Sequence, residues 1–298
     1  MPSLGVRKII RNENLREISR LGVPIDRMSE VRVLSNRHDH LTLRIKVDRS
    51  CLVAKIFPGH HYREILIYRI LREAGVPTIT VLSETDRSLL LEDLESSEEW
   101  RLGVAPDLSS SAAGTAIARW YRKLHESGQH PALQCPNAFP WEGEVLSGET
   151  IMDATTKLDL RNHDSVRLAI ARLPDLKAAY QALPQTLTHN DFYWTNLALR
   201  RDMERAVMFD YHVMGTGNPA SDCRNVLSSL KGAAAQSFKR TYGPVDCRAA
   251  ILDEPLAVLY SLVAASERES LPGWARPIID AVRSGEFACS LHRALRHL

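Results

Sequence analysis

The chain has 298 residues, of which 44% are hydrophobic, and this is enough for one large domain or two lobes with a substantial core. Its 38 basic and 36 acidic side chains leave a formal charge of +2, which argues against the strongly basic face of a nucleic-acid-binding protein. No N-terminal apolar leader and no stretch of about 20 apolar residues stands out, so we expect a cytoplasmic protein without a membrane partner. The five cysteines lack metal-site or redox spacing, and we expect buried, reduced thiols.

The first third of the chain is rich in predicted strands. After a short amphipathic helix predicted over residues 12–21, apolar residues alternate with polar ones in VRVL, HLTLRIKV and CLVAKIF, which predicts a three-stranded antiparallel meander. The segment YREILIYRILREAG has helical apolar spacing and ends at a glycine. TITVLSE and SLLLEDL predict two further strands, so residues 1–94 read as a small sheet with one helix.

The remainder of the chain is predicted to be mostly helical. SSSAAGTAIARWYRKLHESG predicts a helix that stops at Gly128, and SVRLAIARLPDLKAAYQAL predicts another. Two short strands flank the segment LTHNDFYWTNLAL, and helices follow to the end. The pattern predicts an α+β protein with a β-rich N-terminal lobe over residues 1–94 and an α-rich C-terminal lobe over residues 95–298.

The segment HNDFYWTN crowds polar side chains into one predicted loop. Asp191 and Asn196 lie in that loop, and Asp210 follows at the end of the apolar strand AVMFD. In phosphoryl transfer one carboxylate orients the attacking hydroxyl, while an amide and a second carboxylate hold a divalent metal ion on the phosphates. Taken singly, each residue is more often a turn or helix cap. The order and spacing of the three favour the catalytic interpretation.

The N-terminal lobe offers an independent indication of phosphate binding. Lys55 lies within the predicted strand CLVAKIF, and Glu64 lies early in the next helix. A glutamate that pairs with a strand lysine holds the flexible ammonium toward bound phosphates. Such a pair is ordinarily a solvated strand residue and a surface helix charge, but its position ahead of the loop motif favours a nucleotide site.

HNDFYWTN and FDYHVMGTGNPASD resemble the catalytic and metal-binding segments of the aminoglycoside phosphotransferase and choline kinase superfamily, the small-molecule branch of the protein-kinase-like fold. The resemblance runs from the strand with Lys55 to Asp222 and implies a two-lobe kinase-like fold. It implies that Asp191 is the catalytic residue, and that Asn196 and Asp210 ligate Mg²⁺.

The same resemblance implies that Lys55 contacts the α and β phosphates of ATP or GTP and that Glu64 positions it. The backbone of Glu92, Asp93 and Leu94 corresponds to the hinge that binds the purine base. His189 and Asp222 correspond to residues that support the catalytic loop.

Several positions depart from the family pattern. The turn LSNRHDHL has no glycine, which leaves Asn36 or Arg37 as candidates for phosphate contact. Tyr211 and His212 follow Asp210 where a glycine or small polar residue is more familiar, and Asn218 stands where the family commonly has aspartate.

The acceptor site is indicated by aromatic and acidic residues. Tyr193 and Trp194 lie between the proposed base and a proposed metal ligand, and Trp141 stands beside Glu142 in an acidic stretch. Aromatic and acidic side chains can hold cationic or sugar-like molecules. The alternative is that the aromatics pack in the core and the acids form a solvated face.

We therefore expect a Mg²⁺-dependent kinase that phosphorylates a hydroxyl group of a small polar metabolite or antibiotic, working as a monomer or homodimer. The alternative is a nucleotide-binding pseudokinase that acts as a regulatory module. A protein kinase is less compatible, because the short segment GTGNPASD leaves no room for a long activation loop.

Overall fold

The computed structural model describes residues 11–36, 40–57, 63–135 and 138–298, so the candidate phosphate contact Arg37 lies outside the described residues. Two compact units are present. The first comprises Met1–Ser127, Asp191–Val213 and Ser229–Tyr242, and the second comprises Gly128–Asn190, Met214–Ser228 and Gly243–Leu298. The expected lobe boundary between residues 94 and 95 falls inside the first unit and stays a prediction.

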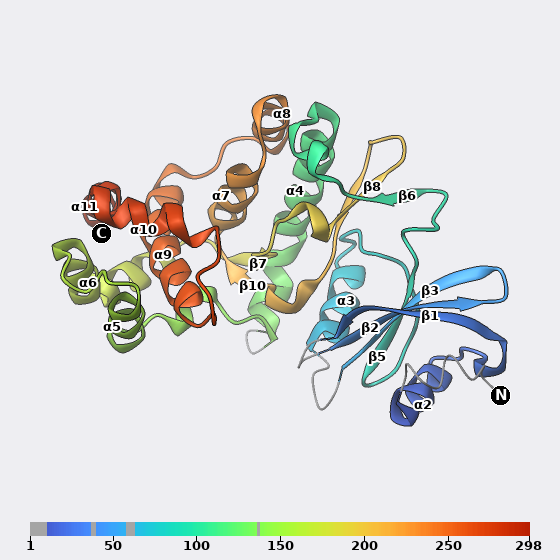
Figure 1. Cartoon of the computed structure of the whole chain (residues 1–298). Coiled ribbons are helices and arrows are strands. Elements are labelled where there is room, and N and C mark those ends of the chain that lie inside the picture. Colours follow the sequence, from blue (N-terminus) through green and yellow to red (C-terminus); the bar gives the residue numbers. More distant parts are fainter. Residues whose placement is uncertain (1–10, 37–39, 58–62, 136–137) are drawn as a thin grey trace. The chain divides into compact units, whose positions relative to one another are not determined.

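A five-stranded antiparallel sheet dominates the first unit, with strand order β1-β2-β3-β5-β4 (Figure 1). Its strands are β1 (Met28–Asn36), β2 (Leu41–Val47), β3 (Ser50–Ile56), β4 (Val81–Glu84) and β5 (Ser88–Glu92). The hairpin between β2 and β3 turns at Asp48, which adopts a left-handed backbone with φ of 51°. The meander that the alternating pattern predicts is thereby confirmed.

Two helices accompany this sheet in the first unit, α2 (Asn12–Arg20) and α3 (Arg63–Glu73). Ile18 of α2 is buried in one core with Ala54 and Ile56 of β3. Because alternate residues of a strand face opposite sides, Lys55 lies on the other face, where Glu64 of α3 meets it.

The first unit also contains a second, three-stranded antiparallel sheet with the order β6-β8-β9. The other described elements of this unit are β6 (Trp100–Leu102), η2 (Ala105–Ser109), η5 (Trp194–Asn196), β8 (Leu197–Arg200), β9 (Ala206–Met208), η6 (Tyr211–Val213), α8 (Gly232–Tyr242), the short turn η1 (Ile25–Arg27) and the part of α4 (Ser111–Gln134) up to Ser127. This sheet places the loop that carries Asp191 and Asn196 beside the strand that leads to Asp210.

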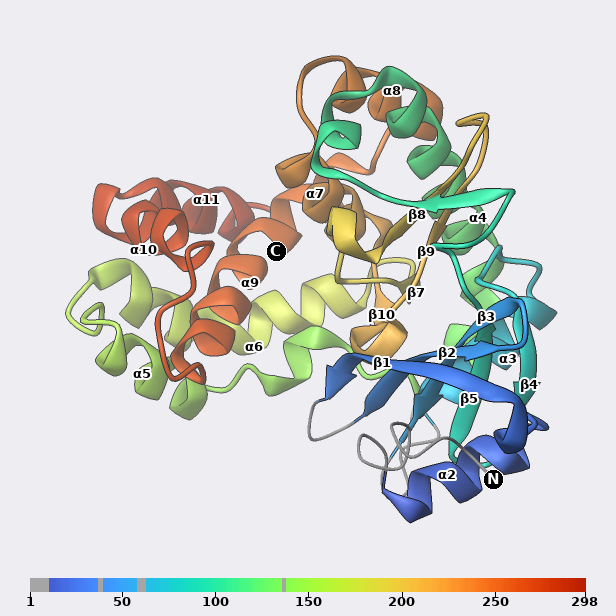
Figure 2. The ribbon, with the colours of Figure 1, turned by 45° about the vertical axis from the view of Figure 1, so that its right-hand side comes forward.

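The second unit is mostly helical and has one two-stranded antiparallel sheet, β10-β7. Its elements are η4 (Glu142–Val145), α5 (Gly148–Lys157), α6 (Asp164–Gln181), β7 (Thr186–Thr188), β10 (Gly215–Gly217), α7 (Pro219–Ser229, of which Ser229 belongs to the first unit), α9 (Cys247–Ser266), α10 (Ala275–Ser284) and α11 (Glu286–Leu295). Helices α5, α6, α10 and α11 surround α9 (Figure 2), and their apolar faces form one core.

Helix α9 corrects the expectation that no stretch has the length and composition of a membrane span. Its 20 residues are apolar enough to cross a membrane, judged by length and composition alone. Half of the apolar window is buried inside the protein, however, and Asp253 lies in the middle of the helix. This arrangement is typical of a core helix.

Two other expectations are corrected. Helix α4 (Ser111–Gln134) does not stop at Gly128. A Cβ atom on Gly128 would lie 2.8 Å from Leu187 Cβ, so the glycine permits close approach of β7 instead of ending the helix. The five cysteines are free, but only Cys223 is buried.

Candidate active site

Lys55 lies at the centre of a buried ion-pair group in the first unit. Its Nζ is 2.7 Å from Glu64 Oε2 and 2.9 Å from Asp210 Oδ1, and the exposed fraction of its side chain is 8%. Burial alone would lower the pKa of Lys55, but the charges of Glu64 and Asp210 outweigh burial and raise it. The ammonium therefore stays charged and points at the end of β9.

Asp210 follows β9 with a left-handed backbone, φ 65°, which is uncommon for a residue other than glycine. The Nδ1 atom of His212 is 3.3 Å from Asp210 Oδ1. Burial raises the pKa of Asp210, but the nearby His212 imidazole and the Lys55 ammonium more than offset it and hold the pKa well below its usual range. The carboxylate is thus ionised and oriented by two neighbours.

Asp191 and Asn196 are joined within their loop. Asn196 Nδ2 donates to Asp191 Oδ2 at 2.7 Å and to the Asp191 carbonyl oxygen at 3.2 Å. The carbonyl oxygen of Asn196 accepts from the backbone N–H of Phe209, the residue before Asp210. A backbone hydrogen bond therefore connects the loop to the Asp210 segment.

A cavity of about 380 Å³ lies in the first unit. Lys55, Glu64, Asn196 and Asp210 are among the polar side chains that line it. Apolar side chains line it too, among them Val53, Ile79, Leu91 and Leu102. A lining with both charged and apolar side chains suits a nucleotide, which has charged phosphates and a flat base.

The proposed hinge residues Glu92, Asp93 and Leu94 also line this cavity. The Glu92 side chain accepts from Ser97 Oγ, and its backbone N–H donates to the Thr80 carbonyl. The carboxylate of Asp93 accepts hydrogen bonds from the side chains of Arg44 and Ser96. Among the described residues, none bonds the backbone N–H or carbonyl of Leu94, which leaves these groups available to a base edge.

Asp222 fixes the backbone directly ahead of Asp191. The two oxygens of its buried carboxylate accept from the N–H groups of His189 and Asn190, at 2.8 and 2.9 Å. His189 itself is fully buried. Asn190 has a left-handed backbone, φ 63°, so the two hydrogen bonds hold a turn that a non-glycine residue rarely adopts unaided.

The four candidate acceptor residues fall into two groups. Trp141 and Glu142 line a small cavity of the second unit together with Tyr180, whose ring is stacked on Trp141 at 5.3 Å. Tyr193 is 51% exposed, its ring is tilted against Trp194, and neither residue lines this cavity or the larger one of the first unit.

Two of the positions that depart from the family pattern, Tyr211 and Asn218, have structural explanations. Tyr211 is fully buried, packs edge-on against Tyr68 and donates to the Met208 carbonyl. Asn218 Oδ1 accepts from the Ala220 N–H and so caps α7, a role that asparagine and aspartate share. These substitutions leave the carboxylate of Asp210 in place.

The side chains present fit a magnesium ion that is bound together with phosphates. Within the described part of the chain, no group of three or more His, Cys, Asp and Glu side chains is placed to hold a metal ion alone. Mg²⁺, however, takes one or two protein oxygens and completes its shell with water and phosphate oxygens. Asp210 supplies a carboxylate, and Asn196, whose Nδ2 is engaged by Asp191, has its Oδ1 for such an ion.

The sequence did not point to several residues of the second unit's cavity. Thr188, Arg224 and Asp253 come from β7, α7 and α9 and meet only in the folded unit. No local spacing connects them, so sequence patterns carried no signal for this group.

A family model described as a phosphotransferase enzyme family matches residues 30–252. No curated protein matches the chain.

Three similar solved structures have low sequence identity to the chain. A macrolide 2′-phosphotransferase from Brachybacterium faecium is 15% identical with a TM-score of 0.58, covering 91% of this chain and 96% of that one. A choline/ethanolamine kinase family protein from Mesorhizobium loti is 17% identical with a TM-score of 0.60, covering 94% and 98%. A spectinomycin phosphotransferase in complex with AMP is 12% identical with a TM-score of 0.62, covering 96% and 98%.

These likenesses confirm the predicted kinase-like α+β fold, with its antiparallel N-terminal sheet and helical remainder. The family model spans well over half of the chain and includes Lys55, Asp191, Asn196 and Asp210. The chain therefore belongs to the phosphotransferase enzyme family.

Proposed function

We propose that the protein transfers the γ-phosphoryl group of ATP or GTP, with Mg²⁺, to a hydroxyl group of a small polar metabolite or antibiotic. The observation that carries the proposal is the buried group of Lys55, Glu64 and Asp210 on the wall of the 380 Å³ cavity. Burying an ammonium between two carboxylates costs desolvation energy. Binding of a polyphosphate to this ammonium would explain why the protein holds it there.

The cavity supports a nucleotide as co-substrate. The apolar side chains of its lining can pack against a purine base. The backbone N–H and carbonyl of Leu94, for which no partner is found among the described residues, can hydrogen-bond to the polar edge of that base. Lys55 and the proposed metal ligands Asn196 and Asp210 line the same cavity, as the binding of phosphates requires. A similar spectinomycin phosphotransferase was solved with AMP, which agrees with this assignment.

In the proposed reaction the acceptor hydroxyl oxygen forms a bond to the γ-phosphorus while the bond from that phosphorus to the β,γ-bridging oxygen breaks. Asp191 accepts a hydrogen bond from the hydroxyl, orients it in line and takes its proton, and ADP or GDP leaves. Asn196 holds the Asp191 carboxylate through the 2.7 Å hydrogen bond. Lys55 offsets phosphate charge, and Glu64 keeps its ammonium in place.

Asp210 and Asn196 would hold Mg²⁺, which supplies charge neutralisation to the phosphates when it is bound. The low pKa of Asp210 keeps this carboxylate ionised and ready to bind a cation.

We place the protein in the cytoplasm as a monomer or homodimer with a small-molecule acceptor and no nucleic-acid or membrane partner. The balanced charge and the packing of α9 inside a helical core support this placement.

The test is a mass-spectrometric search for phosphorylated products after incubation with Mg²⁺, ATP or GTP, and a panel of aminoglycosides, macrolides, amino alcohols, hydroxy amino acids, sugars and nucleosides. We expect one class to gain a phosphoryl group, and we expect the Asp191→Asn variant to lose the product. Nucleotide binding without any product in the whole panel would instead support the pseudokinase.

A further inference from the structure

One face of α7 holds the backbone that leads into Asp191. The Asp222 carboxylate accepts from the N–H groups of His189 and Asn190, at 2.8 and 2.9 Å. Three residues further along the same face of the helix, Nδ2 of Asn225 donates to the carbonyl oxygen of Asn190, also at 2.9 Å. A carbonyl oxygen only accepts hydrogen bonds, so this contact requires a donor such as the amide NH₂ group of Asn225.

The hydrogen bond from Asn225 acts on the peptide unit that joins Asn190 to Asp191. A peptide unit is planar, and its six atoms include the Cα atoms of both residues that it joins. The carbonyl oxygen of Asn190 therefore lies in one plane with the N and Cα atoms of Asp191. By holding that oxygen, Asn225 fixes the tilt of the plane and the direction in which the chain enters Asp191.

The backbone of Asn190 explains why two anchors are needed. Its φ of 63° lies in the left-handed region, which a residue other than glycine keeps only where its surroundings hold it. The bonds to Asp222 hold N–H groups that precede the φ and ψ rotations of Asn190 in the chain. The bond from Asn225 holds an oxygen that follows them. The two side chains together therefore fix both sides of the unfavourable turn.

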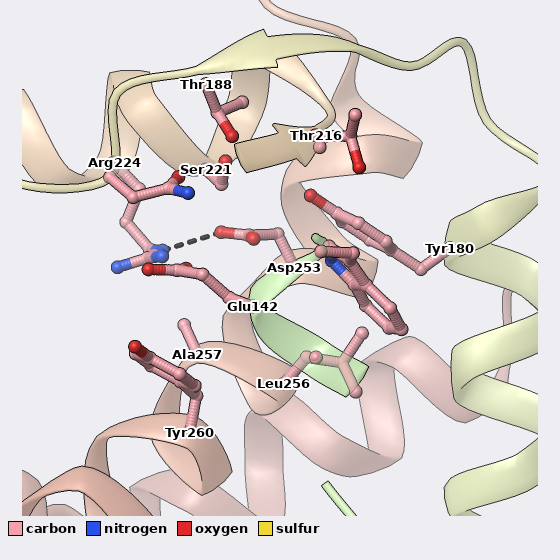
Figure 3. Close-up of a pocket in the computed structure, with 14 residues that line it drawn as sticks. Glu142, Tyr180, Thr188, Thr216, Ser221, Arg224, Asp253, Leu256, Ala257 and Tyr260 are labelled. Atoms are coloured by element: carbon pink, nitrogen blue, oxygen red, sulfur yellow. Dashed lines mark hydrogen bonds and ion pairs between the residues drawn. The ribbon is translucent and has the colours of Figure 1, made fainter. Parts of the chain in front are cut away.

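Helix α7 is itself anchored within the second unit. At its start, Asn218 Nδ2 donates to the Pro184 carbonyl oxygen at 2.9 Å. Further along the helix, Arg224 Nε donates to Asp253 Oδ2 of α9 at 2.6 Å, and the Asp253 side chain is only 7% exposed (Figure 3). The neighbouring residue Asn225 is therefore carried by a helix that is bonded at two places.

We infer that Asn225 is a positioning residue for Asp191, acting through the carbonyl oxygen of Asn190. The inference rests on the proposed function, in which Asp191 is the base. Asn225 is not among the residues that line the 380 Å³ cavity, so its loss should affect turnover and leave nucleotide binding unchanged.

Two variants of Asn225 separate positioning from packing. Asn225→Leu keeps the approximate size and removes the donor, so kcat should fall about ten- to hundred-fold, while KM for the nucleotide stays within about two-fold. Asn225→His keeps an N–H donor close to the position of the amide nitrogen, and its kcat should return to within about three-fold of the parent value.

Gln185→Met is the matched control. Gln185 Nε2 also donates to backbone carbonyl oxygens of the second unit, those of Tyr180 and Leu183. The control therefore loses hydrogen bonds of the same kind, and its kcat should equal that of the parent protein. Turnover is measured as release of ADP or GDP in the presence of Mg²⁺ and the acceptor that the product search identifies.

A second measurement requires no turnover. Hydrogen exchange of the backbone N–H groups of His189 and Asn190 is followed by NMR in the parent protein and the variants. Because the turn loses one of its two anchors, both groups should exchange about three-fold or more faster in Asn225→Leu. They should exchange at the parent rate in Gln185→Met.

The outcomes separate this inference from the proposed function. Unchanged exchange or unchanged kcat in Asn225→Leu overturns the inference, and full activity of that variant leaves the kinase intact. An equal loss of kcat in Gln185→Met, or no recovery in Asn225→His, also overturns it. Faster exchange in Asn225→Leu, in a protein that phosphorylates no acceptor, supports the hold of Asn225 on the loop and overturns the kinase.

Discussion

Lys55 Nζ lies 2.9 Å from Asp210 Oδ1, which joins residues 155 positions apart in the chain. The same ammonium is 2.7 Å from Glu64, so a single cation links β3, α3 and the segment after β9. The position of Lys55 in the cavity therefore depends on both carboxylates, and each can be tested alone.

The Glu64→Gln variant removes one of these carboxylates. We expect kcat/KM for the nucleotide to fall about ten- to hundred-fold, because Lys55 loses a charged hydrogen bond that orients it. Glu84→Gln is the matched control, since Glu84 accepts from Arg69 at the same 2.7 Å in a more exposed pair. Steady-state kinetics with varied nucleotide measures the difference, and equal losses in the two variants would contradict the orienting role.

The Asp191→Asn variant keeps the shape of the proposed base and removes its charge. Turnover should fall about a thousand-fold, because the amide can neither accept the proton nor align the hydroxyl as an anion does. Nucleotide affinity, measured by calorimetry, should stay within about two-fold, since Asp191 is absent from the cavity lining. Near-normal turnover would rule out Asp191 as the base.

The Asp210→Asn variant tests the metal assignment. The concentration of Mg²⁺ that gives half-maximal activity should rise about ten-fold or more, because a neutral amide is a weaker ligand than a carboxylate. Activity of the parent protein should vanish with a chelator and return with added Mg²⁺. An unchanged Mg²⁺ requirement in the variant would remove Asp210 from the metal site.

The Asp93→Asn variant tests a stabilising role for a hinge residue. Arg44 donates to the Asp93 carboxylate through Nε and Nη2, at 3.0 and 2.7 Å, and Ser96 donates at 2.6 Å. Burial opposes ionisation, but these donors lower the pKa of Asp93 below its usual value. We expect the free energy of unfolding at pH 7 to fall by about 1–3 kcal/mol.

The acid dependence of this effect follows from the direction of the shift. The stabilisation is fully present above the unfolded pKa, about 3.9, and is lost as the pH falls through the lower folded value. Urea unfolding of parent and variant from pH 7 to pH 2.5 should therefore show the two converging only below about pH 4. Asp86→Asn, in an exposed pair with Arg20, is the control and should change little. Convergence well above pH 4 would contradict the lowered pKa.

Much of the fold was predictable because it rests on local patterns. The alternation in β2 and β3 placed Lys55 on the face opposite Ala54 and Ile56, and helical spacing located α3 with Glu64 near its start. The prediction that a helix ends at Gly128 was wrong, because a glycine in a helical pattern can either end the helix or allow another segment to pack closely against it. The contact with Leu187 decided between these, and it belongs to another part of the chain.

The sequence by itself determined the family and the order of its motifs, since Lys55, Asp191, Asn196 and Asp210 lie within short segments whose spacing is a local property of the chain. Only the tertiary structure decided which distant side chains meet. Thr188 and Arg224, 36 positions apart, line one cavity because β7 and α7 pack in the same unit. Whether a polar atom finds a partner, as Arg224 Nε does and Thr188 Oγ1 does not, is settled by packing across the whole unit, which no short window of sequence contains.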